Sequence, residues 1–156
     1  MQELSLIDKS AELQSIKQKY GRRYFADPEA LKEACTLWGV KSNEHGVVLD
    51  FNEEELVKAG KCKASMSYIE TTTGHVLIGL DVSTAIDSFG YAPSVWSGTG
   101  FASYWDARLF AVQKFIDYFE SVALSNNSFS SEDYRKNIER ALALLKDEMM
   151  PQLELF

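Results

Sequence analysis

The stretch SYWDARLFAVQKFIDYFESV, residues 103–122, decides the fold of this chain. Apolar residues recur in it at the three- and four-residue spacing of a helix, and polar residues form only a narrow stripe. Ser103 and Asp106 have the spacing of an N-terminal capping pair. The pattern predicts a long helix that is buried on most sides and forms the structural centre of a domain. The apolar positions are Trp105, Leu109, Phe110, Val112, Phe115, Ile116, Tyr118, Phe119 and Val122.

The sequence before this helix is typical of β-structure. Residues 61–71 alternate between apolar and polar, residues 75–83 are rich in Val, Leu and Ile, and residues 91–96 form a third short run. Pro93 in the third run favours an edge strand or a bulge. Thr72-Thr73-Gly74 forms a turn between the first two runs, and the three runs together predict a small antiparallel three-stranded sheet.

Two further elements are expected ahead of the sheet. Residues 47–51 form a short apolar run, which predicts a strand. Asn52 then precedes residues 53–58, which begin with three glutamates. Negative charge is favourable at a helix N-terminus, so this segment predicts a short helix capped by Asn52.

Helices are predicted at both ends of the chain. Residues 8–20 have helical apolar spacing and stop at Gly21. A second helix opens at Asp27, where Asp caps and the following proline suits the first turn, and it ends at Gly39. The last helix runs from a cap at Ser130 or Ser131 to about residue 149.

These elements predict an α+β fold with an N-terminal helical pair, the sheet, the long helix and a C-terminal helix. We expect residues 1–150 to form a single domain and residues 151–156 to form an extended tail. Pro151 disfavours helix at the residue before it, so the chain is expected to leave the last helix there.

Composition limits the classes of protein that this chain can represent. Apolar residues make up 46% of its 156 residues, which is enough for a packed core. No apolar run reaches the ~18 residues of a membrane span, and the first residues lack the pattern of a signal peptide, so a cytoplasmic protein without membrane contact is expected. The net charge of −7 disfavours broad nucleic-acid binding, because an acidic surface repels phosphate.

The chain ends in the apolar pentapeptide Gln152-Leu153-Glu154-Leu155-Phe156. Burying an exposed Leu or Phe side chain contributes roughly 1.5–3 kcal/mol, so three such side chains on an extended segment favour a docked state. They dock on a partner or, alternatively, pack against the protein's own last helix.

This pentapeptide resembles the clamp-binding peptide of bacterial polymerases and mismatch-repair proteins, which has the pattern QL[SD]LF. Gln152, Leu153, Leu155 and Phe156 match it, and Glu154 departs from Ser or Asp at the tolerant middle position. The resemblance implies that the bacterial sliding clamp is the partner. It also implies that Leu155 and Phe156 fill an apolar pocket, that Leu153 adds a contact and that Gln152 binds at the pocket edge.

A basic and aromatic cluster is the one candidate contact for nucleic acid. Lys19, Arg22, Arg23 and Tyr24 lie close together near the end of the first helix. Cations beside aromatic rings are typical of sites that hold single strands. The alternative is that the cations stabilise the helix C-terminus while the rings belong to the core or its rim.

No carboxylate pair, Ser-His-Asp order or cysteine-histidine spacing indicates an active site, a metal or a cofactor. The order of elements over residues 52–124 is similar to double-stranded-RNA-binding domains, without their lysine-rich helix start. Residues 90–119, with the three strands before them, are loosely similar to HicB-type antitoxins. We therefore expect a non-enzymatic accessory or regulatory protein of DNA replication or repair, of a type that phages or mobile elements encode. The alternative is an antitoxin or immunity-type interaction module; oligomeric state is left open.

Overall fold

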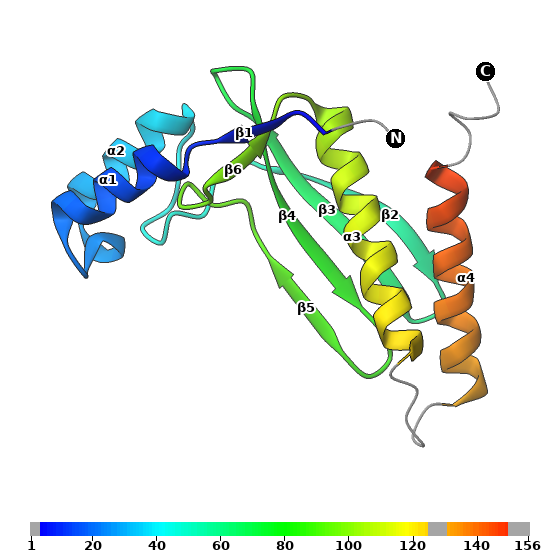
Figure 1. The fold of residues 1–156 in the computed structure, drawn as a ribbon. Coiled ribbons are helices and arrows are strands. Elements are labelled where there is room, and N and C mark those ends of the chain that lie inside the picture. Colours follow the sequence, from blue (N-terminus) through cyan, green and yellow to red (C-terminus); the bar gives the residue numbers. More distant parts are fainter. Residues whose placement is uncertain (1–3, 125–130, 150–156) are drawn as a thin grey trace. The chain divides into compact units, whose positions relative to one another are not determined.

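The computed structural model describes residues 4–124 and 131–149. Within these residues it has an α+β fold with four α-helices and an antiparallel sheet of six strands (Figure 1). The predicted α+β class is confirmed, whereas the prediction of three strands is wrong. The elements are β1 (Leu6–Asp8), α1 (Ser10–Tyr20), the 3₁₀ helix η1 (Tyr24–Ala26), α2 (Pro28–Trp38), β2 (Asn52–Ala59), β3 (Cys62–Glu70), β4 (Val76–Ser83), β5 (Ser88–Tyr91), β6 (Thr99–Phe101), α3 (Tyr104–Leu124) and α4 (Glu132–Met149).

The segment that begins with Asn52 and three glutamates is strand β2, so the prediction of a helix over residues 53–58 is wrong. Leu56, Val57 and Ala59 of β2 are buried. Gly60 adopts a φ of 59° in the two-residue connection to β3, and this positive φ suits a tight hairpin. Burial and hairpin pairing therefore outweighed the local preference of the glutamates for a helix start.

The sheet has the strand order β1-β6-β4-β3-β2, and β5 pairs with β4 beside this path. The strand predicted over residues 91–96 lies earlier, as β5, because residues 88–91 pair with β4 across a tight turn. Pro93 follows β5 and has no N–H to give to a ladder. The predicted strand at residues 47–51 forms only the isolated bridges Ser42↔Val48 and Val47↔Ser94.

Two compact units alternate along the chain. Unit 1 comprises residues 1–52, 67–79 and 92–107, and unit 2 comprises residues 53–66, 80–91 and 108–156. In unit 1 the ring of Trp38 is fully buried, and a Cβ at Gly100 would come within 2.9 Å of it. Gly100 lies in strand β6, and because it has no side chain, the Trp38 ring can approach the sheet at this position. The unit 1 core is Leu13, Ile16, Ala30, Ala34, Trp38, Val48, Leu77 and Val95.

Side chains from two other segments satisfy the C-terminus of α2 in unit 1. The Lys9 ammonium donates to the Leu37 carbonyl at 2.9 Å. The Thr72 and Thr73 hydroxyls donate to the carbonyls of Gly39 and Trp38 at 3.1 and 3.4 Å. The last carbonyls of a helix have no partner within it, so these contacts connect α2 to the start of α1 and to the turn before β4.

In unit 2, α3 from Arg108 onward and α4 lie side by side across one face of the sheet (Figure 1). The Asp106 N–H donates to the Ser103 hydroxyl at 3.1 Å, which confirms the predicted cap of α3. Trp105 is exposed, so its predicted place on the buried face is wrong. Buried residues from the two helices are Ala111, Val112, Phe115, Ile116, Phe119, Tyr134, Ile138, Ala141 and Leu145.

Candidate interaction sites

The pentapeptide lies outside the described residues, together with the rest of the predicted tail. This holds for all four predicted clamp-binding residues, Gln152, Leu153, Leu155 and Phe156. The structure instead defines the helix that precedes them. The Tyr134 N–H donates to the Ser131 hydroxyl at 3.1 Å, so Ser131 is the cap that begins α4.

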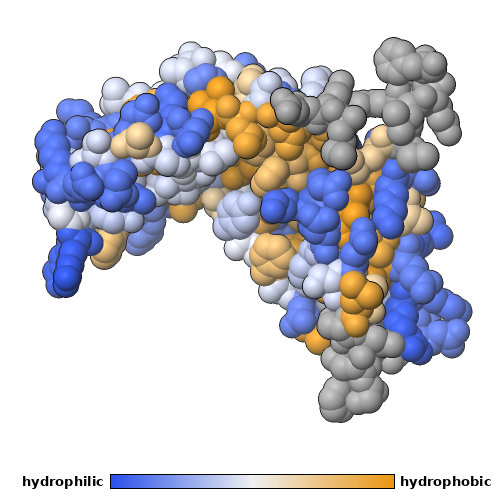
Figure 2. Space-filling model, viewed as in Figure 1, coloured by the Kyte–Doolittle hydropathy of each residue, from blue (hydrophilic) through white to orange (hydrophobic). Residues whose placement is uncertain are grey.

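Helix α4 presents one apolar side to unit 2. Tyr134, Ile138, Ala141 and Leu145 are buried at helical spacing. Figure 2 shows the outward surface of α4 as mainly hydrophilic. The helix predicted from Ser130 or Ser131 to about residue 149 is confirmed up to Met149, where the described part of α4 ends.

An ion-pair network holds the last turn of α4. Arg108 of α3 donates through Nε to Glu54 of β2 at 3.1 Å and through a terminal nitrogen to Glu148 of α4 at 2.9 Å. Burial by itself would lower the pKa of Arg108, but the hydrogen bonds and charges of the two glutamates outweigh it and raise that pKa. The network therefore joins three elements of unit 2 one residue before α4 ends.

A cleft of about 490 Å³ lies beside the same turn, between β2 and α4. Leu56 and Leu144 give it an apolar surface, while Glu55, Asp147 and Glu148 supply carboxylates. Lys58 also lines the cleft, and Glu55 and Glu148 form ion pairs with Lys63 and Arg108.

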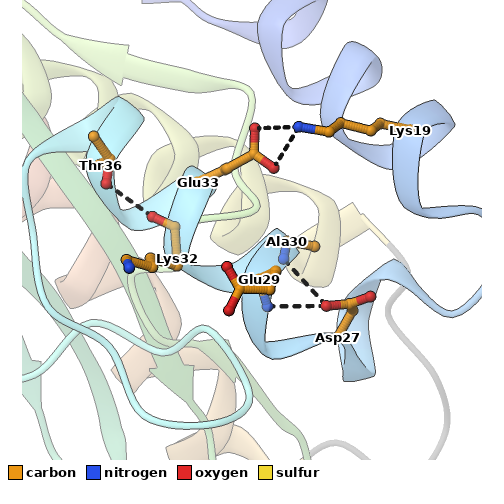
Figure 3. A network of polar contacts seen from close by, with 7 residues as sticks. All are labelled: Lys19, Asp27, Glu29, Ala30, Lys32, Glu33 and Thr36. Carbon is orange, nitrogen blue, oxygen red and sulfur yellow. Dashed lines mark hydrogen bonds and ion pairs between the residues drawn. The ribbon is translucent and has the colours of Figure 1, made fainter.

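The four residues of the predicted basic and aromatic cluster differ in their contacts and in their exposure. Lys19 contacts both carboxylate oxygens of Glu33 at 3.3 and 3.2 Å (Figure 3). The Tyr24 ring packs edge-on against Trp96, with 4.9 Å between ring centroids. Arg22 and Arg23 are exposed. Two of the four candidate residues are thus engaged within unit 1, and nucleic-acid contact stays a prediction.

The surroundings of this cluster carry negative charge. The exposed ring of Phe25 borders a hollow of about 460 Å³ that is also lined by Asp27 and Glu44. The Asp27 carboxylate accepts from the N–H groups of Glu29 and Ala30 and so caps α2, as predicted (Figure 3). Phosphate is repelled by such carboxylates, which disfavours a nucleic-acid backbone at this hollow.

An acid-base network links α1 to α2 beside the cluster. A hydrogen bond from Tyr20 is the main cause that lowers the pKa of Glu33, and the Lys19 ammonium adds to it. The same contacts raise the pKa values of both donors. Lys19 is exposed, whereas Tyr20 and Glu33 are half-buried, so the network links the two helices at the rim of the unit 1 core.

One surface was not predicted from the sequence. Ile86, Phe89 and Tyr91 are exposed apolar side chains on β5 and the turn before it. Phe89 and Tyr91 alternate with Ser88 and Gly90, which is a strand signal, but it is too short to be recognised without its partner β4.

Three further observations bear on function. Comparisons of the chain with protein-family models, with curated proteins and with solved structures gave no match. Among residues 4–124 and 131–149, no three His, Cys, Asp or Glu side chains gather so that they could hold a metal ion. None of the helices in that part of the chain combines the length and apolar character that a membrane crossing needs. These comparisons leave the class of the molecule defined by its α+β fold.

Proposed function

We propose that this chain is a non-enzymatic accessory or regulatory protein of DNA replication or repair that binds the bacterial sliding clamp through residues 152–156. The observation that carries the proposal is the sequence Gln-Leu-Glu-Leu-Phe, which follows the end of α4 at Met149 after two residues. Pro151 lies in this short connection and separates the peptide from the helical pattern. This favours an extended peptide over a continuation of the face that α4 buries.

The expected affinity follows from the three apolar side chains. Leu153, Leu155 and Phe156 contribute roughly 4–9 kcal/mol in total when they are buried on a partner. Ordering the peptide and losing translational freedom offset a large part of this gain. These two contributions alone give a dissociation constant on the order of 0.1 mM or weaker.

The alternative is that the pentapeptide packs on its own domain. The cleft beside the last turn of α4 offers the apolar side chains of Leu56 and Leu144. Packing there would add stability to the domain, whereas docking on the clamp would not. Loss of clamp binding on truncation, with unchanged stability, therefore distinguishes the two states.

The test measures binding of the purified bacterial sliding clamp to the full chain and to a chain that lacks residues 152–156. We expect the truncated chain to lose detectable binding while its circular dichroism spectrum and melting temperature stay unchanged. The double substitution Leu155→Ala and Phe156→Ala should act like the truncation. Glu154→Ala is the matched control in the same peptide and should keep binding, because the middle position is tolerant.

Equal binding by the full and truncated chains, or no binding by either, refutes the proposal. The antitoxin or immunity-type interaction module then becomes the leading function, and its partner would be sought on the folded units.

A further inference from the structure

Strand β5 forms an edge of the sheet that has no charged side chain to prevent another strand from pairing with it. It comprises Ser88–Tyr91, it pairs with β4 on one side, and no strand of the described residues pairs with its other side. All of its residues are exposed, and none carries a charge at neutral pH. The edge strand β2, in contrast, carries three glutamates and Lys58, and the edge strand β1 ends at Asp8. Charged side chains are a common protection of sheet edges, and β5 lacks it.

The register of β5 shows which backbone groups are available. The Thr84 N–H donates to the Asp87 carbonyl at 2.7 Å and closes the hairpin that joins β4 to β5. Hydrogen-bonded and non-hydrogen-bonded pairs alternate along an antiparallel ladder. Counted from the closing pair, Phe89 exchanges its bonds with β4, whereas Ser88 and Gly90 direct their N–H and C=O groups to the open edge.

The side chains of β5 add an apolar surface on the same side as α3. Phe89 lies opposite Val82 in the register, and its ring packs against Tyr118 of α3 with 5.2 Å between centroids. It nevertheless keeps 46% of its surface exposed. Tyr91, two residues further, points to the same side and is also exposed.

We propose that β5 binds β5 of a second copy of this chain, antiparallel and across a twofold axis. Ser88 of one copy then pairs with Gly90 of the other, and each of the two symmetry-related pairs exchanges two backbone hydrogen bonds. Phe89 meets Phe89 of the second copy as a non-hydrogen-bonded pair, in which side chains are closest.

A second copy fits this edge better than a foreign strand. The outward pattern of β5 is its own complement under twofold symmetry, and pairing of Ser88–Tyr91 with its copy brings no two like charges opposite each other. A charged peptide would find no opposite charge on β5 to recognise. The twofold arrangement also uses up both open edges, so the assembly closes at two copies.

The size of the contact predicts a weak dimer. Phe89 and Tyr91 leave roughly 100 Å² each to be covered, since a fully buried aromatic side chain covers about 150–250 Å². Two copies then bury several hundred Å² of aromatic surface together with the strand backbone. This is below the roughly 1,200 Å² of stable complexes, so association should depend on concentration.

The experiment is sedimentation equilibrium of the full chain from micromolar to millimolar concentration. We expect the mass to rise from 17.6 kDa toward twice that value. Phe89→Lys places two like charges opposite each other and should keep the mass at that of one chain throughout. Ile86→Lys is the matched control, because Ile86 is 53% exposed in the turn and outside the paired residues, and it should associate like the unaltered chain.

Disulfide crosslinking through a cysteine at position 89 provides a second measurement if Phe89→Lys does not fold. In a chain with Cys35→Ser, Phe89→Cys should form an intermolecular disulfide on mild oxidation, whereas Ile86→Cys should not. A mass of one chain at every concentration, equal loss of association in both lysine variants, or equal crosslinking in both cysteine variants overturns the proposal. Neither sedimentation nor crosslinking depends on clamp binding. Failure of the dimer proposal and failure of the proposed function are therefore distinguishable.

Discussion

Replacing Arg108 with Met tests whether the ion-pair network stabilises unit 2. The side chain of Arg108 is only 21% exposed and makes charge-assisted hydrogen bonds to Glu54 and Glu148. Such bonds contribute about 1.5–3 kcal/mol each when buried, but both carboxylates are partly exposed and regain water when Arg108 is removed. Met replaces the aliphatic part of the side chain. We expect a loss of about 2 kcal/mol in the free energy of unfolding.

The assay is thermal and urea unfolding followed by circular dichroism. A loss of this size lowers the melting temperature of a chain of this length by roughly 4–8 °C. Lys146→Met is the matched control, because Lys146 is 55% exposed and lies 3.8 Å from Glu120. Exposed pairs contribute little, so this control should change stability by no more than about 0.5 kcal/mol. Equal effects of the two substitutions would show that the Arg108 contacts do not carry the stability assigned to them.

Two other predictions concern unit 1. Tyr20→Phe should raise the pKa of Glu33 toward 4.5, measured by carbon NMR of the carboxylate, because it removes the main hydrogen bond that lowers that pKa. The pKa of Glu33 is lower in the folded than in the unfolded chain. Its stabilising contribution is therefore present above the unfolded pKa and is lost as pH falls through the folded pKa. If the pKa of Glu33 is the same in Tyr20→Phe, Tyr20 does not have this role. Gly39→Ala should destabilise more than Gly74→Ala in urea unfolding: both positions have positive φ, costing about 1 kcal/mol, but only at Gly39 would the new Cβ collide with the Thr72 hydroxyl. Equal losses would mean that this collision is relieved at no cost.

The sequence predicted the elements whose signal is local. Strands β3 and β4 follow from alternating and apolar runs, and α2 follows from the Asp27 cap and the stop at Gly39. Strand β2 could not be predicted in the same way, because its glutamates favour a helix start and only its pairing with β3 decides for a strand. Strands β1 and β6 have three residues each, which is too short for a recognisable period.

The candidate sites also differ in whether their sequence signal is local. The pentapeptide at residues 152–156 is contiguous and therefore visible in the sequence. Arg108, in contrast, is 54 residues from Glu54 and 40 residues from Glu148, and no sequence spacing connects them. The open edge of β5 also depends on a non-local fact, which is that no described strand follows it in the sheet.

Dimerisation through β5 would also affect clamp binding through residues 152–156. A pair of chains joined through β5 carries two pentapeptides, and the second peptide to bind a surface crowded with clamp does so at a high effective concentration. Phe89→Lys should then weaken retention of the chain on densely immobilised clamp, while the affinity of a single chain for clamp in dilute solution stays unchanged. A weak dimer contact would thus matter for function because it adds a second peptide, even though it adds little binding energy of its own.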